Sequence, residues 1–150
     1  INFPSPGFAY GQHRRNLERN NYGVQQELKT LRTAKELGFY TFGLAYDEEI
    51  AMQIAADNHD ALVLGLAMLE WENGGATLEQ AAEYINRVSK AVAPEMLIFV
   101  QGLPVQTPED TQYIYDHTDA VGFIGINNMD YGTKPIQDTV AAFKSAKIHA

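Results

Sequence analysis

The sequence predicts an α/β fold with parallel strands. Five short apolar segments alternate with amphipathic segments along the 150 residues, and this alternation favours parallel strands joined by right-handed crossover helices. A complete eight-stranded barrel needs roughly 250 residues. Two architectures are therefore open: one half of a larger (βα)8 barrel, or a five-stranded doubly wound parallel sheet that would close within this length.

The expected strands are short and rich in apolar residues. The segment at 61–68 is nearly continuous in them, which is typical of a parallel strand covered on both faces. Small residues within the strands favour the barrel, because eight strands crowd its axis and small side chains must point inward. The expected strands are 1–3, 40–46, 61–68, 97–101 and 121–127, and the small residues expected to point inward are Gly43, Ala45, Gly65, Ala67, Gly122 and Gly125.

Helix signals follow the same order along the chain. Apolar residues recur at helical spacing over 24–37, and Gly38 fits a C-terminal cap. Asp47 is expected to cap a helix at 48–58, whose first-turn acids suit the positive end of the helix dipole.

Three more helices are expected in the second half of the chain. Thr77 and Gln80 match a capping box that opens a helix reaching about residue 92. Thr107 is expected to cap the next helix, which has a proline at its first position, and a last helix is expected at 135–146. No linker or low-complexity segment divides the chain, so residues 1–150 are expected to form a single α/β unit.

The composition excludes several classes of function. The formal net charge is −8 and the pI is about 4.8, whereas a nucleic-acid or anionic membrane surface needs concentrated Lys and Arg, so neither partner is expected. The chain has no cysteine, which excludes disulfides, thiolate nucleophiles and Cys-ligated zinc. It has neither an apolar run of about 20 residues nor a signal peptide, so a cytoplasmic protein is expected.

Candidate site residues are selected by their place after strands, because ligands of both architectures bind at the carboxyl ends of the strands. The loops in those places are 10–15, 46–47, 69–75, 101–105 and 127–132. The same rule puts His59 and His117 at the opposite edge of the sheet. They are expected to be capping or surface residues rather than ligands.

The longest of these loops is acidic. Glu70 and Glu72 could bind a magnesium ion or act as acid and base, and Gly74 and Gly75 would let the loop move as a lid. A solvated acidic loop explains the same residues somewhat better, because isolated acids in loops are common.

The loops after the last two strands are candidates for phosphate binding through backbone N–H groups, a task that favours glycine. Gly102 and Gly125 stand in those loops, although turns and tight packing also explain them. No P-loop, GxGxxG, HExxH or GxSxG motif occurs in the sequence. The lack of a dinucleotide fingerprint weakens the doubly wound alternative.

Two groups of residues carry a family resemblance. The first is Asn2-Phe3-Pro4, Gly7, Gly11, Arg15-Asn16-Leu17-Glu18, Tyr22-Gly23 and Glu27. The second is Gly102, Pro104, Pro108-Glu109-Asp110, Gln112-Tyr113-Ile114, Gly122-Phe123, Gly125 and Met129. Together they resemble the phosphoenolpyruvate hydrolase-like TIM-barrel family, which is similar to the larger group of phosphoenolpyruvate mutase and isocitrate lyase. The resemblance implies the second, C-terminal half of a TIM barrel. It also implies chemistry on C–C or C–P bonds beside an enolate, usually with Mg²⁺, without identifying the metal ligands.

The chain departs from the family pattern at several rim positions. The family usually has an acidic residue at Tyr10, histidines at Gly65 and Gln101, and small hydroxyl residues at Asn127 and Asn128. These differences weaken the expectation of acid–base chemistry more than that of anion binding, because asparagine still donates hydrogen bonds to an anion.

Two functions are therefore open. In the first, the domain is a hydrolase or lyase for a small 2-oxo or enol acid, with or without a phosphoryl group. Arg14 or Arg15 would clamp the carboxylate, and Glu70 or Asp130 would act as acid or base. The remaining anion contacts would come from Gln101, Gly102, Gly125, Asn127 and Asn128.

In the second, the barrel is catalytically degenerate and serves as a ligand- or protein-binding module, or as a half-barrel assembly unit. A half-barrel leaves strand edges and an apolar interior open. The chain is therefore expected to form a homo-oligomer or to associate with the remaining half of the barrel, and not to be a stable monomer alone.

Overall fold

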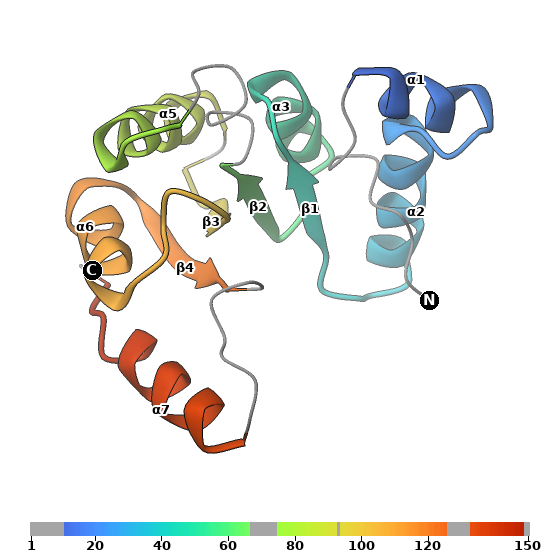
Figure 1. Ribbon diagram of the computed structural model, residues 1–150. Helices are drawn as coiled ribbons and strands as arrows, with labels where there is room; N and C mark the ends of the chain where they lie inside the picture. The colour runs from blue at the N-terminus through green and yellow to red at the C-terminus, as the bar shows by residue number, and fades with distance from the viewer. Residues whose placement is uncertain (1–10, 67–74, 93, 126–132, 149–150) are drawn as a thin grey trace.

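The computed structural model describes residues 11–66, 75–92, 94–125 and 133–148 of the chain. Strands and helices alternate through this part (Figure 1), which confirms the predicted α/β class. The elements are α1 (Gly11–Arg19), α2 (Val24–Glu36), β1 (Phe42–Ala45), α3 (Glu48–Ala56), β2 (Ala61–Gly65), α5 (Leu78–Ala91), β3 (Leu97–Gln101), α6 (Pro108–His117), β4 (Ala120–Ile124) and α7 (Thr133–Phe143). The strand expected at 1–3 lies outside the described residues.

The four described strands form one parallel sheet in the order β1-β2-β3-β4. Each strand therefore pairs with the next one along the chain. A doubly wound sheet reverses its strand order near the middle, and the described strands contain no such reversal. The five-stranded doubly wound alternative is not supported by this order.

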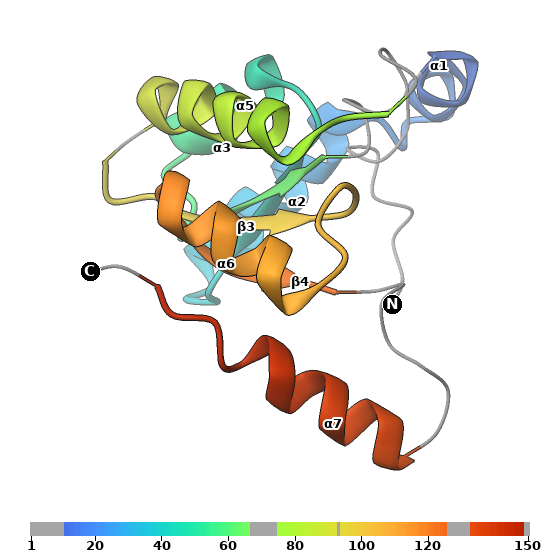
Figure 2. The ribbon, with the colours of Figure 1, turned by 60° about the vertical axis from the view of Figure 1, so that its left-hand side comes forward.

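The helices lie on the outer side of the curved sheet. Figure 1 shows α2, α3, α5 and α6 following one another in an arc outside the strands, with α7 continuing it. Figure 2 shows α3 and α5 over the strands, and α7 at the other end of the helix arc, beyond α6 and β4. The ring of Phe143 in α7 stacks on Phe123 of β4, with 5.4 Å between the ring centroids. The inner, concave side of the sheet carries no described helix.

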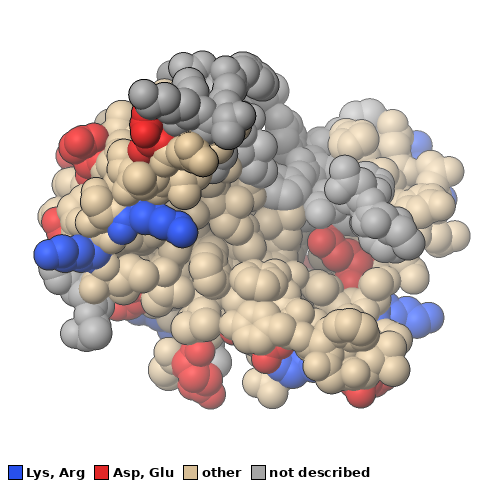
Figure 3. Space-filling view, turned by 90° about the horizontal axis from the view of Figure 1, so that it is seen from below, with Lys and Arg blue, Asp and Glu red and all other residues tan. Residues whose placement is uncertain are grey.

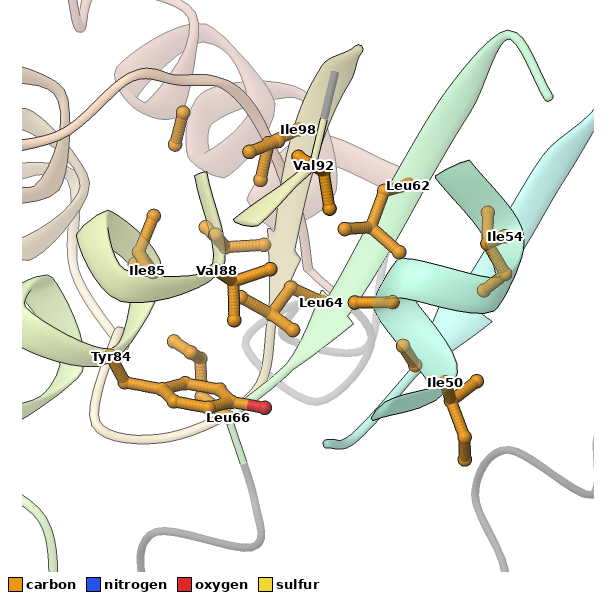
Figure 4. Packing of buried hydrophobic residues seen from close by; sticks show 14 of the residues in the cluster. Ile50, Ile54, Leu62, Leu64, Leu66, Tyr84, Ile85, Val88, Val92 and Ile98 are labelled. Atoms are coloured by element: carbon orange, nitrogen blue, oxygen red, sulfur yellow. The ribbon is translucent and has the colours of Figure 1, made fainter. Parts of the chain in front are cut away.

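The hydrophobic core fills the space between the sheet and the helix arc. Leu62 and Leu64 point outward from β2 and meet Ile54 of α3 and Val88 of α5, all of them buried (Figure 4). Fully burying one such side chain stabilises the fold by about 1.5–3 kcal/mol. The outer face of the sheet is thus the face that holds this part of the chain together.

The described small residues of the strands lie on both faces of the sheet, which corrects the prediction that all of them point inward, and Ala67 lies outside the described residues. A Cβ atom on Gly43 would collide with Ile54 of α3, and Ala45 belongs to the outer core. A Cβ on Gly122 would instead meet the ring of Phe99 on the concave side. Two closely packed layers, and not one crowded axis, account for these residues.

Three helices have N-terminal caps at the residues that the sequence predicts. Asp47 accepts a hydrogen bond from the Ile50 N–H at 2.8 Å and caps α3. Complete capping boxes occur at Thr77 of α5 and at Thr107 of α6. Gly38 adopts a φ of +84° just after α2, a conformation that favours glycine at a helix end.

Helix α1 is the element that sequence patterns missed. Arg14 and Arg15 were expected in a loop, but both lie on this helix. Leu17 is its one aliphatic residue, so the segment lacks the apolar periodicity that predicts an amphipathic helix. Most of its residues, the glutamine, arginines, leucine and glutamate, are instead good helix formers, and it carries an ion pair between Arg14 and Glu18, four residues apart, at 3.3 Å. Among the described helices, none is long and apolar enough to cross a membrane.

Candidate functional site

The carboxyl ends of the four strands meet at one edge of the sheet, as in other parallel α/β proteins. Tyr46 and Asp47 follow β1, Leu66 follows β2, Gly102 follows β3 and Gly125 follows β4. We call this edge the rim. Glu70, Asp130, Asn127 and Asn128, which the sequence predicts to lie on the same rim, are outside the described residues.

Arg14 reaches the rim from helix α1. Its Nη1 donates to Asp47 Oδ2 at 3.3 Å, while its Nε donates to Glu18 Oε1 at 3.3 Å. The guanidinium therefore lies between two carboxylates. To clamp the carboxylate of a ligand, it would have to exchange or share one of these partners. Arg15 is exposed on the same helix.

Tyr46 directly follows β1, and Gly65 and Gln101 end the neighbouring strands β2 and β3, so the three residues lie at the rim. Gly65 pairs with Gln101 in the sheet register, and the Leu66 N–H donates to the Gln101 carbonyl at 2.9 Å. The ring of Tyr46 lies directly against Gly65, so that a Cβ atom there would overlap the ring. Tyr46 and Gln101 are each half-buried.

Tyr84 of α5 fixes this arrangement from the outer layer. Its hydroxyl donates to the Tyr46 carbonyl at 2.8 Å, and its ring is buried beside Leu66, with the hydroxyl directed away from α5 (Figure 4). Sequence reasoning placed Tyr46 on the rim but missed Tyr84. No local pattern could have found it, because the two tyrosines are 38 residues apart.

The glycines of the rim have structural explanations of their own. Gly102 adopts a φ of +97°, a backbone conformation that other residues rarely adopt. A Cβ atom on Gly125 would lie 3.2 Å from the ring of Phe123. The turn and packing explanations therefore apply to both residues, and phosphate binding by them remains a prediction.

A magnesium site is not identified among residues 11–66, 75–92, 94–125 and 133–148. No group of three or more His, Asp or Glu side chains there could hold a metal ion. The described residues thus offer no ligand set against which Mg²⁺ can be fitted. Its presence remains an implication of the family resemblance.

The opposite, amino edge of the sheet holds a compact polar cluster. Asp60 Oδ2 accepts hydrogen bonds from the N–H and the hydroxyl of Thr41, at 2.8 and 3.0 Å, and its Oδ1 pairs with Lys35 Nζ at 3.0 Å. Hydrogen bonds from the Thr41 backbone and from Lys35 lower the pKa of Asp60 to about 2. Nδ1 of His59 lies 3.0 Å from the Thr41 hydroxyl oxygen. We call Thr41, His59, Asp60 and Lys35 the amino-edge cluster.

His59 is buried, which corrects the expectation that it lies at the surface. The Thr41 hydroxyl has one proton and donates it to Asp60, so its oxygen accepts from Nδ1–H of a neutral His59. Nε2 of His59 is buried without a hydrogen-bond partner in the described part of the chain. Desolvation lowers the pKa of His59, against the raising effect of Asp57. His117, by contrast, is exposed at the end of α6 and stacks on Tyr113.

Comparison with known proteins places the chain in a family. A family model described as phosphoenolpyruvate hydrolase-like matches residues 1–146, so the chain belongs to that family. The tomato (Solanum lycopersicum) ToMV susceptible protein tm-1(GCR26) and ToMV resistance protein Tm-1(GCR237) are each 26% identical to it over 149 residues, covering 94% of this chain and 20% of their own length. A Sinorhizobium fredii protein with the provisional name of transcriptional regulatory protein y4pA is 29% identical over 157 aligned residues, covering 97% of this chain and 25% of its own length. The chain therefore spans about a fifth to a quarter of these curated relatives.

Proposed function

We propose, from its membership of the phosphoenolpyruvate hydrolase-like family, that the chain forms the C-terminal half of a TIM-barrel domain. The rim of this domain binds a small 2-oxo or enol acid, with or without a phosphoryl group. The observation that carries the proposal is the convergence of Tyr46, Gly65 and Gln101 on the rim, with Arg14 held nearby by Asp47. In a barrel this rim is where catalysis and binding take place.

The concave face of the sheet supports the half-barrel. Register pairs align Leu44, Val63, Phe99 and Gly122 in one row across the four strands on this face, and inward-pointing side chains from all strands likewise line the interior of a barrel. At the amino end of this face, Phe42 is 46% exposed. Figure 3 views the molecule from the open side of the arc, where charged residues lie mostly toward the margin.

A row of aromatic rings lies on this open face, and exposure of these rings to water is unfavourable. The ring centroids of Tyr40 and Phe42 lie 5.2 Å apart, and those of Phe42 and Phe99 lie 5.5 Å apart. Contiguous apolar surface of this kind marks an interaction surface or an aggregation hazard. The first half of the barrel, in the same polypeptide, is the occupant that we propose, and a second copy of the chain is the alternative.

The chemical roles follow from residue types on the rim. Arg14, Gln101 and the backbone N–H groups near Gly102, with Asn127 and Asn128, donate to the anionic oxygens of the ligand. Glu70 and Asp130 supply the acid–base step. Mg²⁺, when bound, would stabilise negative charge that develops on an enolate oxygen.

A non-catalytic binding module is the second candidate. The relatives carry names of virus susceptibility, virus resistance and transcriptional regulation, and none of these names denotes an enzyme. The rim departs from the family pattern at Gly65, where the ring of Tyr46 occupies the space of a side chain. Binding without turnover is the expected behaviour of such a rim.

Titration and turnover assays on one sample separate the candidates. The protein should contain residues 1–150 together with the remainder of the barrel, and be offered phosphoenolpyruvate and pyruvate with and without Mg²⁺. An enzyme converts phosphoenolpyruvate at a rate that falls at least tenfold in Glu70→Ala or Asp130→Ala, while Glu83→Ala, an exposed acid on α5, serves as the control. Binding without turnover supports the second candidate. Binding of neither acid under any of these conditions contradicts the proposed ligand class.

A further inference from the structure

Residues just after strand β1 make side-chain and backbone contacts with two other helices, α1 and α5. Tyr84 donates to the Tyr46 carbonyl at 2.8 Å, and Asp47 both caps α3 and receives Arg14 at 3.3 Å. Arg87 pairs with Glu48 at 3.2 Å and lies 5.3 Å from the centroid of the Tyr84 ring. Three consecutive residues, 46 to 48, are thus each fixed by another element.

The residue that these contacts hold in place is Tyr46, and its side chain faces the barrel interior. Alternation along β1 puts Phe42, Leu44 and Tyr46 on one face, and Phe42 packs against Phe99 on the concave side. The ring then leans across the neighbouring strand onto Gly65. Tyr46 therefore supplies the bulk that position 65 lacks, at the end of the interior that opens onto the rim.

We propose that Tyr46 is the specificity-determining residue of the rim site, and that Tyr84 is its positioning residue. This inference rests on the proposed function and names the ligand class more closely. The Tyr46 ring limits the room above Gly65, so the site takes acids as small as pyruvate and rejects those with a bulky substituent. The phenol group and the Gln101 amide in the same layer provide neutral donors for the oxygens of the acid.

A change of preference between two acids tests this inference in the complete barrel protein. Pyruvate and phenylpyruvate are the probes, and the ratio of their dissociation constants is measured by calorimetry. Tyr46→Ala removes the ring, so the preference should move toward phenylpyruvate by at least tenfold. Tyr84→Phe removes only the hydroxyl and should move the preference the same way by a smaller factor, because the Tyr46 carbonyl then loses its hydrogen bond from Tyr84. A purely structural role for Tyr84 would change the melting temperature and leave this ratio unchanged. Tyr22→Ala, an exposed tyrosine between α1 and α2, is the control.

A pair of variants at Gly65 tests the geometry without any ligand. Gly65→Ala should lower the melting temperature, because its Cβ meets the Tyr46 ring, and Tyr46→Ala in the same protein should restore most of the loss. Gly65→Ala with no effect in either background would overturn the inference. An unchanged ratio in Tyr46→Ala, with pyruvate still bound, would overturn it and leave the proposed function standing. Failure of the unaltered protein to bind either acid would overturn both.

Discussion

The residues that flank strand β1, Thr41 before it and Tyr46 after it, have opposite surroundings. Thr41 is buried, and its N–H and hydroxyl are both taken up by Asp60, with His59 packed behind. Tyr46 is half-buried on the rim, against Gly65, which is the register partner of Gln101. At the amino edge Thr41, Asp60 and Lys35 thus bond to one another, and His59 Nε2 is left without a partner among the described residues, whereas the rim is the edge at which parallel α/β proteins bind their ligands. The comparison teaches that the amino edge contributes to stability, whereas the rim is the edge at which we propose binding.

Thr41→Val should produce the largest loss of stability among these changes. It keeps the shape of the side chain but leaves Nδ1 of His59 and one oxygen of Asp60 without the hydroxyl. An unsatisfied buried polar group costs about 1–3 kcal/mol, and urea unfolding of the barrel protein measures the change. Thr33→Val on exposed α2 is the matched control and should cost less than about 0.5 kcal/mol. Equal losses of unfolding free energy in the two variants would show that the Thr41 hydroxyl at the amino edge has no special role in stability.

Asp47→Ala should cost about 1 kcal/mol, because it removes the N-terminal cap of α3. Asp47→Asn keeps a capping oxygen but loses the charge that receives Arg14, so it should retain most of the stability. Thermal unfolding of both variants measures this difference. An alanine variant no less stable than the asparagine variant would show that the cap contributes little.

Acidification should lower the free energy of unfolding, and the loss should begin with protonation of His59 in the amino-edge cluster. Burial lowers the pKa of His59 below its ordinary value of 6.5, so the unfolded chain binds this proton more readily than the folded one. Stability is then constant above about pH 6.5 and falls as the pH decreases below it. The pKa of Asp60, lowered from 3.8 to about 2, adds a further loss only between those two values.

His59→Gln should flatten the dependence of stability on pH between 6.5 and 5, and urea unfolding across this range measures the slope. His117→Gln, at the exposed end of α6, controls for the loss of a histidine as such. Slopes that stay the same in His59→Gln and the unaltered protein would show that His59 is not buried in a neutral form.

Gln101→Ala should have the smallest effect on stability, within about 0.5 kcal/mol, because its strand pairing uses only the backbone. Its effect should appear instead in the binding of pyruvate, which we expect to weaken several-fold as one hydrogen-bond donor is lost. Calorimetry and thermal unfolding of one sample measure both quantities. A marked loss of stability with unchanged binding would assign Gln101 to the structure and remove it from the site.

Features that depend on a few consecutive residues could be predicted from the sequence. The caps at Asp47, Thr77 and Thr107 are examples, because each joins atoms three residues apart. The strand at 97–101 was predicted with its observed bounds, since a short apolar run between turn residues marks a strand. Helix α1 escaped prediction because it lacks the apolar stripe on which helix recognition depends.

By itself, the sequence determined the α/β class, the alternation of elements and the edge of the sheet at which a site should lie. Tertiary structure alone decided that Gly43 faces a helix while Gly65 faces a tyrosine ring, that His59 is buried, and that Tyr84 anchors Tyr46. The physical reason is the distance along the chain over which each interaction acts. Capping and periodicity act over a few residues, whereas the surroundings of a strand residue depend on register and on helices that lie far away along the chain.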